Sequence, residues 1–418
     1  MKLLSSSSSI SISFFPSLSA PSRKPSTRIS VRSSSSLSAT MEGAEEEKKR
    51  VIVCGGGVIG VCTAFFLAKK GAKVTLIEKS SIACAASGKA GGFLALDRCD
   101  GRAISKLART SFNLHRTLSL ELNGSESYGY RPLDTRSLSI TEQDQTSSGS
   151  KSKILPNWVD GPARNPNTIG TVETTAQVHP QFFTRTLLSF AVANHDLEVV
   201  IGELERVEID QGRVKSVVLK DKGVIETDSV VLALGPWSSR FSMISSLFNV
   251  SALKAHNIVL IPKDPTAITP HALFLTYKAA NGGVPMDPEV YPRPTGEVYV
   301  CGMSAKGEVP DNPEEIMGDP ESIKVLKRVA GTVSSRLKEG EVEVKAEQAS
   351  YLPLTDDDKP VIGEMPNVKG CYVATGHSCW GILNGPATGA TMAELVLDGV
   401  SSIVDLTPFS PARFVKKY

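Results

Sequence analysis

The stretch that decides the fold is VIVCGGGVIG, residues 51–60. Its first four residues are apolar throughout, as is typical of a central strand in a parallel sheet. Gly55, Gly57 and Gly60 form a G-x-G-x-x-G pattern at the point where a strand passes into a helix. In this pattern the first glycine turns the chain, the second lets a pyrophosphate approach, and the third allows the helix to pack closely on the strand. The stretch therefore predicts a dinucleotide site.

The residues that follow complete the unit. Residues 58–70 predict a helix that ends before Gly71, and residues 73–78 (KVTLIE) predict the next parallel strand. Glu78 ends that strand, where its carboxylate can accept hydrogen bonds from the ribose hydroxyls of an adenosine. An acidic residue there disfavours the 2′-phosphate of NADP. We therefore expect an α/β fold with a Rossmann-like, doubly wound parallel sheet.

Length and composition narrow the function classes. The chain has 418 residues, enough for two domains and a core that holds a large cofactor. A formal net charge of +2 disfavours nucleic-acid binding and leaves a small-molecule substrate as the expectation. No run of 18 apolar residues occurs, so no transmembrane segment is predicted. The seven cysteines follow neither a C-x-x-C nor a zinc-binding pattern, and no metal site is predicted.

The first forty residues have a composition of their own. They contain 17 serines, five basic residues and no acidic residue. Such a segment cannot bury a core, and its composition is typical of an organelle-targeting peptide. We interpret residues 1–44 as a transit peptide to the chloroplast, with the mitochondrion as the alternative. A disordered tail without a targeting role is the remaining interpretation.

The rest of the chain predicts two domains. Residues 141–170 are polar and lack periodicity, which predicts an irregular excursion, whereas residues 253–302 alternate strands with Pro/Gly turns. We predict a discontinuous dinucleotide-binding domain and a second, α+β domain built on an antiparallel sheet. The first comprises residues 50–100, 171–250 and 345–415, and the second comprises residues 101–170 and 251–344.

Three further segments resemble the FAD-dependent oxidoreductases of the D-amino-acid oxidase superfamily, to which the glycine and sarcosine oxidases belong. Residues 86–92 (ASGKAGG) are similar to the family's small-residue loop after the second strand. Residues 228–238 (DSVVLALGPWS) are similar to the strand and turn beneath the dinucleotide. Residues 375–382 (TGHSCWGI) look like the C-terminal segment whose backbone lies against the flavin ring. The resemblance covers residues 50–415 and implies FAD as the cofactor.

The resemblance and the glycine pattern together give a set of expected FAD-binding residues. Val207 matches the position where the family contacts adenine through the main chain, although an ordinary strand valine fits equally well. Cys301 is interpreted as a small strand residue rather than as a point of covalent flavin attachment. The expected residues are Gly55, Gly57, Val58, Ile59, Gly60, Glu78, Lys79, Ser87, Gly91, Gly92, Val207, Gly235, Trp237, Gly376, Gly381 and Ile382.

The substrate side departs from the family pattern at two positions. The amino-acid oxidases of the family clamp the substrate carboxylate with an arginine where this chain has Leu352, and glycine oxidases carry a second arginine where it has Cys379. Arg293 is expected either to supply a replacement charge or to be a solvated surface residue. Tyr351 and Trp380 are expected to line the pocket or to pack in the core. Free glycine or D-alanine is therefore not the expected substrate.

The expected reaction follows from the resemblance. His377 is the only histidine expected beside the flavin, and it is the candidate for acid/base catalysis, against a structural hydrogen-bonding role. We expect an FAD-dependent oxidase or dehydrogenase that oxidises the C–N bond of an amine or modified amino acid, with hydride transfer to the flavin. Oxygen or another acceptor would reoxidise it. The alternatives are an FAD-dependent hydroxy-acid or alcohol dehydrogenase, and a non-catalytic flavin-binding protein of trafficking or assembly.

Overall fold

The computed structural model describes residues 48–143 and 153–415. The predicted transit peptide, residues 1–44, lies outside the described residues. Within the described ranges, every helix is too short or too polar to cross a lipid bilayer.

The first sheet has six strands in the order β18-β19-β12-β1-β2-β8. Five of them are parallel, and β18 pairs antiparallel with β19 at one edge. This arrangement confirms the predicted Rossmann-like sheet. The strands are β1 (Arg50–Cys54), β2 (Lys73–Glu78), β8 (Leu197–Ile201), β12 (Ser229–Leu232), β18 (Val361–Glu364) and β19 (Cys371–Thr375).

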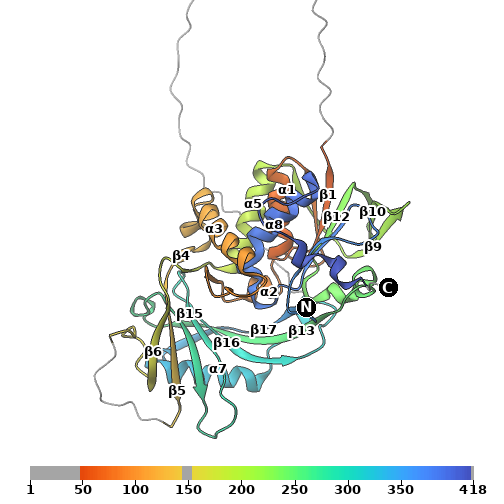
Figure 1. Ribbon diagram of the computed structural model, residues 1–418. Coiled ribbons are helices and arrows are strands. Elements are labelled where there is room, and N and C mark those ends of the chain that lie inside the picture. Colours follow the sequence, from red (N-terminus) through yellow and green to blue (C-terminus); the bar gives the residue numbers. More distant parts are fainter. Residues whose placement is uncertain (1–47, 144–152, 416–418) are drawn as a thin grey trace, which may run out of the picture. The chain divides into compact units, whose positions relative to one another are not determined.

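Both faces of β1 are covered, which explains why its sequence is apolar throughout. Successive side chains of a strand point to opposite faces. Val51 and Val53 pack in the cluster formed with the helices, whereas Ile52 and Cys54 pack against a three-stranded antiparallel sheet. Figure 1 shows the helices on one side of β1 and the small sheet on the other. These elements are α1 (Val58–Lys69), α3 (Ser105–Glu121), α5 (Pro180–Asn194), α8 (Gly381–Asp398), β9 (Leu204–Asp210), β10 (Arg213–Leu219) and β11 (Gly223–Glu226).

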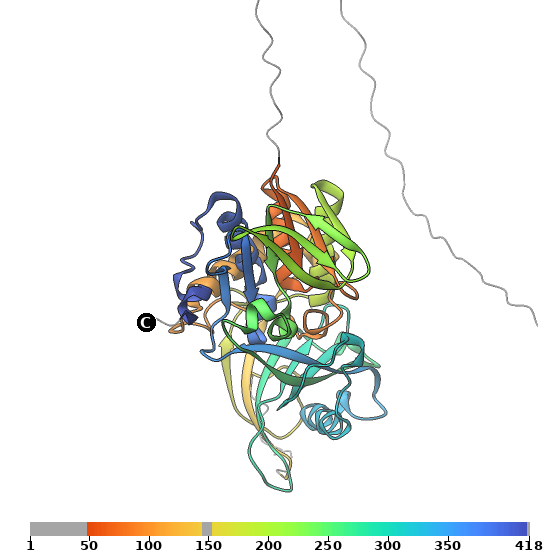
Figure 2. The same cartoon turned by 90° about the vertical axis from the view of Figure 1, so that its right-hand side faces the viewer.

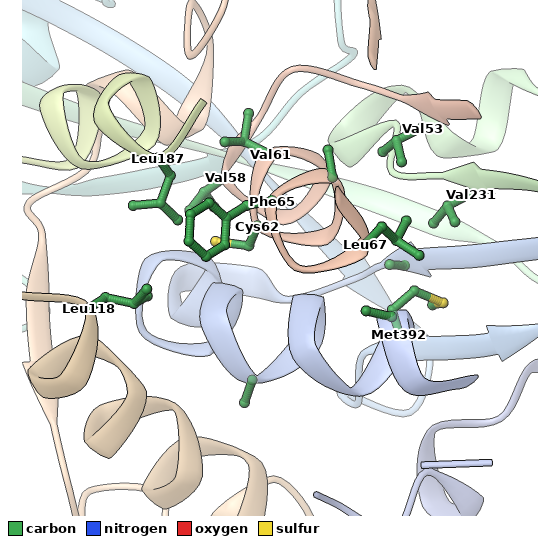
Figure 3. Close-up of a cluster of buried hydrophobic side chains, with 14 of the residues drawn as sticks. Val53, Val58, Val61, Cys62, Phe65, Leu67, Leu118, Leu187, Val231 and Met392 are labelled. Carbon is green, nitrogen blue, oxygen red and sulfur yellow. The ribbon is translucent and has the colours of Figure 1, made fainter. Parts of the chain in front are cut away.

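Helix α8 lies unusually close to α1. A Cβ atom added to Gly389 would lie 2.5 Å from the backbone of Cys62, so only glycine permits this approach. Around the contact, Phe65 of α1, Leu118 of α3 and Leu187 of α5 belong to one buried cluster (Figure 3). Removing a fully buried phenylalanine side chain from such a core costs about 3–5 kcal/mol. The packing therefore fixes α8 firmly on the helix that follows the glycine turn.

The second large sheet has seven strands in the order β17-β13-β16-β15-β14-β5-β6. All neighbours are antiparallel except β14 and β5, which are parallel. Figures 1 and 2 show α7 (Pro320–Val333) on the side of this sheet that is away from the six-stranded sheet. The strands are β5 (Asp134–Thr141), β6 (Ala163–Gly170), β13 (Val250–Pro262), β14 (His271–Lys278), β15 (Glu289–Pro292), β16 (Val298–Lys306) and β17 (Val342–Thr355).

Three details differ from the sequence-based expectations. Part of the predicted irregular excursion, residues 163–170, forms the edge strand β6, whose polar side chains are mostly exposed because it pairs only with β5. The predicted domain boundary at residues 344 and 345 falls inside β17, which pairs with β13 along its whole length. Helix α3, expected in the second domain, packs with α1 and α8. The remaining elements are α2 (Ala86–Lys89), α4 (Gly124–Tyr128), α6 (Ser242–Ser245), β3 (Phe93–Ala95), β4 (Arg131–Pro132) and β7 (Thr175–Gln177).

Candidate active site

The turn between β1 and α1 can be made only by glycines. Gly55 has φ +116°, and an added Cβ atom would lie 2.2 Å from the carbonyl oxygen of Ala233. At Gly60 an added Cβ atom would lie 1.9 Å from the carbonyl oxygen of Gly55. The turn is therefore held tightly between β12 and the first turn of α1.

Backbone N–H groups of this turn face side chains from the neighbouring segments. The N–H of Val58 donates to Ser87 Oγ at 2.9 Å, and the N–H of Gly56 donates to Glu78 Oε2 at 2.7 Å. An added Cβ atom at Gly57 would meet only Ser87 Oγ, at 3.1 Å. Such N–H groups at a helix N-terminus are suited to bind the oxygens of a phosphate.

A cavity of about 710 Å³ runs from this turn to the start of α8. Its volume lies in the range of natural ligand sites. It is lined by segments on either side of the glycine turn and by residues of β17 and the 374–382 segment. The predicted site residues that line it are Gly55, Gly57, Val58, Ile59, Glu78, Lys79, Ser87, Gly235, Trp237, Leu352, His377, Cys379, Gly381 and Ile382.

At the end of the cavity near Glu78, strand β9 and the turn before it contribute other residues than the expected Val207. Val207 pairs with Val217 in the small antiparallel sheet and does not line the cavity. The lining residues of this segment are instead Gly202 and Glu203, in the turn after β8, and Leu204 and Glu205 at the start of β9. Matching a strand to a family pattern gives the segment but leaves its register open by a few residues.

A segment that the sequence did not reveal as part of the site closes over the same end. Lys79 Nζ donates to the carbonyl oxygen of Asp311 at 3.3 Å, and Trp237 Nε1 donates to that of Pro310 at 2.8 Å. Asp311 also forms an ion pair with Arg240. Residues 311–313 line the cavity. This segment belongs to the connection between β16 and α7, so its place at the cavity depends entirely on the tertiary structure.

Glycines 91, 92 and 376 support the cavity from behind its lining. An added Cβ atom would lie 2.6 Å from the ring of Tyr291 at Gly91, and 2.6 Å from Thr355 Cγ2 at Gly376. Gly92 has φ +79° and no room beside the carbonyl oxygen of Val178. These glycines are needed for packing, and none of them lines the cavity.

The far end of the cavity lacks both arginines of the related amino-acid oxidases. Leu352 and Cys379, the residues at the two corresponding positions, line the cavity. Cys379 is exposed to this cavity. Burial, and then the negative charge of Glu289, raise the pKa of its thiol.

His377 is buried beside this end of the cavity. Its Nε2 shares a hydrogen bond of 3.0 Å with Thr388 Oγ1 in α8, and its Nδ1 has no partner among the described residues. Burial lowers the pKa of His377 to about 3, so the ring is neutral near pH 7. The hydrogen bond to Thr388 braces the entry to α8, which favours the structural role over acid/base catalysis.

The first turns of α8 contain a proline. Side chains of α3 form hydrogen bonds to the helix backbone around it. Pro386 has no N–H, so the carbonyl of Ile382 loses its donor within the helix. His115 Nε2 supplies that hydrogen bond at 2.8 Å, and Ser111 Oγ accepts from the N–H of Ala387 at 3.0 Å. Burial lowers the pKa of His115 to about 4, so the neutral ring is the donor. Helix α8 therefore continues through the proline, with α3 fixing the backbone that lines the cavity.

Arg293 is neither a substrate clamp nor a surface residue. It is buried, its NH1 lies 3.3 Å from Glu297 Oε2, and its NH2 donates to the carbonyl oxygen of Ala90 at 3.0 Å. Its guanidinium also lies 5.1 Å from the ring centre of Tyr299. Arg293 does not line the cavity. The expectation of a replacement charge is corrected, because Arg293 is held by Glu297, which also pairs with Lys345, and by the carbonyl of Ala90, outside the cavity lining.

The two aromatic residues expected near the substrate pack in the core. Tyr351 lies in a small cluster with Ile316 and Trp237, and Trp380 packs against the helical cluster. Neither lines the cavity.

The expected cofactor fits this site. The space at Gly57 is one that any side chain would fill, and the N–H groups of Gly56 and Val58 are positioned at the start of α1. Glu78 and Ser87, which now accept from these groups, are the side chains expected to meet the ribose and the pyrophosphate of FAD. The cavity then continues to the N-terminus of α8, whose dipole favours negative charge on a reduced flavin.

Comparisons with known proteins agree with this geometry. The DAO family model, described as FAD dependent oxidoreductase, matches residues 50–395. The Schizosaccharomyces pombe protein C1F5.03c is 30% identical over 394 residues, which cover 87% of this chain and 98% of that protein. Glycine oxidase of Bacillus licheniformis is 26% identical over 367 residues, 83% of this chain and 92% of that enzyme.

A known structure shares the fold. The crystal structure of glycine oxidase from Geobacillus kaustophilus matches with a TM-score of 0.72 at 22% identity, covering 88% of this chain and 100% of that one. The family match covers both large sheets and most of α8. The chain therefore belongs to the DAO family of FAD dependent oxidoreductases.

Proposed function

We propose that this enzyme oxidises the C–N bond of an amine whose recognition does not depend on a carboxylate clamp. The observation that carries the proposal is the pairing of Leu352 and Cys379 at the far end of the cavity. A buried carboxylate needs a charged partner, and an arginine clamp supplies it in two hydrogen bonds. Neither residue can do so, and the nearby Arg293 is already paired with Glu297.

The reaction class is supported by the family and by a relative that is itself an amine-oxidising enzyme by name, glycine oxidase. FAD, when bound, would supply a hydride acceptor: the amine nitrogen first gives its extra proton to solvent, the C–H bond next to the neutral nitrogen then breaks with its hydride passing to the flavin, and a protonated imine results. The chain's own residues hold the cofactor. We assign the pyrophosphate to the N–H groups of Gly56 and Val58, the ribose to Glu78, and the flavin to the segment 377–382.

The test is anaerobic reduction of the flavin by candidate substrates. Full-length holoenzyme is mixed with primary and secondary amines without a carboxylate, with free glycine, D-alanine and sarcosine, and with hydroxy acids. We expect loss of flavin absorbance with one or more amines, and negligible loss with the free amino acids because no fixed cation orients their carboxylate.

The other outcomes identify the competing functions. Reduction by hydroxy acids alone would identify an alcohol dehydrogenase. A bound FAD that no donor reduces would identify a flavin-binding protein without catalysis. Rapid turnover of free glycine would show that another cation acts as the clamp. Reoxidation of the reduced enzyme by oxygen then decides between an oxidase and a dehydrogenase.

We also propose that residues 1–44 direct the enzyme to the chloroplast. The support is the serine-rich, basic and acid-free composition of this segment. A fluorescent protein fused to residues 1–44 should enter plastids in plant cells. Accumulation in mitochondria would select the alternative target, and a cytosolic signal would refute the proposal.

A further inference from the structure

A row of side chains crosses the seven-stranded sheet on the face toward the cavity. Leu352 lines the cavity, and Gln348, four residues earlier on β17, points to the same face because side chains alternate along a strand. Residues directly opposite each other on neighbouring strands share a face. Starting from Gln348, the register therefore places on this face Asn257 of β13, Cys301 of β16, Glu289 of β15 and Phe274 of β14.

Glu289 is a carboxylate without a salt-bridge partner among the described residues. Its Oε2 accepts from Tyr291 Oη at 2.5 Å and from Cys301 Sγ at 3.5 Å. Its Oε1 has no hydrogen-bond partner in the described part of the chain, and none of the described basic side chains lies within 4.0 Å of either oxygen. Burial raises the pKa of Glu289, and the hydrogen bonds from Tyr291 and Cys301 and the more distant charge of Arg98 offset this only in part.

The carboxylate faces a hollow. Strands flank Glu289 on both sides, yet Glu289 and its neighbour Cys301 are only half-buried. A residue in the middle of a sheet keeps such exposure only where its face opens onto a space. Cys379, which lines the cavity, lies close enough for the charge of Glu289 to raise the pKa of its thiol. Glu289, Cys301 and Asn257 lie outside the lining of the 710 Å³ cavity itself. We infer that the space in front of Glu289 adjoins that cavity beside Cys379.

A second acceptor on the same row also lacks a donor. Asn257 is 2% exposed, and its Oδ1 has no hydrogen-bond partner among the described residues. Buried polar atoms in native proteins are usually paired, so such an atom indicates a missing ligand or water. Asn257 and Glu289 lie on either side of Cys301. Together they form a site rich in acceptors.

The charged groups around this site favour a cation. Arg98 is the nearby positive charge, and its guanidinium lies 4.2 Å from the ring centre of Phe274, on the side of Glu289 away from Cys301. Asp287 is an exposed acidic residue two positions before Glu289. On the side toward Cys301 and Asn257, no basic side chain of the described residues pairs with Glu289 or Asn257, while Arg102 is close enough to Cys379 to offset part of the rise in the pKa of its thiol.

We propose that Glu289, with Asn257, binds the protonated nitrogen of the substrate, so that the site takes aliphatic amine cations rather than carboxylates. This inference rests on the proposed function, because it names the class of amine that the same site accepts. An ammonium group has three N–H donors and no acceptor. It would donate to Glu289 Oε1 and form an ion pair with this carboxylate, with Asn257 Oδ1 as the second unpaired acceptor on the same row.

The experiment measures binding without turnover. Holoenzyme is titrated with n-butylamine, at a mildly alkaline pH where an alkyl amine is still protonated, and separately with sodium butyrate of similar shape. Binding is read from the perturbation of the flavin spectrum and from the shift of the thermal unfolding temperature. We expect butylamine to bind and butyrate not to bind. Glu289→Gln should weaken butylamine by on the order of ten- to a hundred-fold, the usual effect of removing a hydrogen bond to a charged group.

Matched variants keep the result specific. Asp287→Asn removes the same charge from the exposed neighbour and should change butylamine affinity by less than about two-fold, because exposed charges interact weakly. Asn257→Ala provides a second route if Glu289→Gln does not fold, and it should also weaken butylamine. Unchanged butylamine affinity in Glu289→Gln would overturn the proposal. So would the absence of butylamine binding, or binding of butyrate that is lost in Arg98→Gln.

The two proposals fail in different ways. If butylamine binds through Glu289 but no amine reduces the flavin, the binding site stands and the proposed reaction falls. If an amine reduces the flavin equally well in wild type and Glu289→Gln, the reaction stands and this assignment of Glu289 falls.

Discussion

The two ends of the cavity are built in different ways. The end at the glycine turn is lined mainly by residues within 54–59 and 77–87, many of them glycine, alanine or serine, with residues 202–205 and 311–313 beside them. The other end combines Leu352 of β17 with the segment 377–382, and we propose that Glu289 of β15 extends it. Backbone groups can bind any dinucleotide phosphate, whereas side chains on a rigid sheet can be exchanged without changing the fold. We therefore expect substitutions at the first end to affect cofactor binding and substitutions at the second end to affect the choice of substrate.

The largest expected effect is the loss of FAD binding in Gly57→Val. A side chain at residue 57 would meet Ser87 Oγ and occupy the space expected for the pyrophosphate. We expect a folded protein without FAD, as measured by flavin absorbance per protein and by circular dichroism. Gly71→Ala is the matched control, since Gly71 has φ +94° with open space around it. It should cost about 1 kcal/mol of stability and keep the flavin. Stoichiometric FAD in Gly57→Val would show that the site is misplaced.

The hydrogen bond from His115 of α3 to the carbonyl of Ile382 in α8 supports a residue of the cavity lining. His115→Ala removes the donor to the Ile382 carbonyl and leaves a cavity, which should lower the free energy of unfolding by about 2–4 kcal/mol. Chemical denaturation of the holoenzyme measures this loss. In a Pro386→Ala background, residue 386 regains an N–H for that carbonyl. The cost of His115→Ala should then fall by about 1 kcal/mol. Equal costs in both backgrounds would mean that the hydrogen bond does not replace the one lost to proline.

An arginine at residue 352 would test whether this residue contacts the substrate. Leu352→Arg places a guanidinium in the cavity lining, where the related amino-acid oxidases carry one. We expect affinity for a simple carboxylate such as butyrate to rise about ten-fold, measured by perturbation of the flavin spectrum. Leu352→Met is the control for a long side chain without charge. Because an unpaired buried charge is costly, thermal unfolding must be compared in parallel. No gain in carboxylate affinity would place residue 352 away from the substrate.

The smallest expected effect concerns His377. Its pKa is about 3 in the folded protein and about 6.5 in the unfolded chain, which therefore binds a proton first as pH falls. Stability from this group is present above about pH 6.5 and is lost progressively toward pH 3. Between pH 7 and about pH 5, His377→Asn should lose less stability than wild type, by on the order of 1 kcal/mol. Denaturant titrations at the two pH values measure this difference.

The same pKa has a consequence for the reaction. Since His377 stays neutral, its protonation should leave no trace in the rate of flavin reduction between about pH 5 and 8. A pH dependence that disappears in His377→Asn would restore the acid/base role.

The cofactor end was predictable because its chemistry is local. Gly55, Gly57 and Glu78 stand close together in sequence, and their spacing fixes a strand, a turn and a helix before any distant contact forms. The resemblance added the segments 86–92, 228–238 and 375–382. Those predictions depended on position in sequence, and the cavity lining agrees with them to within a few residues.

The sequence by itself determined the parallel sheet, the glycine turn and the absence of arginine at residues 352 and 379, because these depend on residue type and short-range spacing. Only the tertiary structure decided that Arg293 pairs with Glu297 away from the cavity, that residues 311–313 line the cavity, and that His115 supports α8 across a proline. It also decided which side chains face one another across the seven-stranded sheet. A one-residue change of strand register moves every side chain to the other face, and no local pattern in the sequence fixes that register.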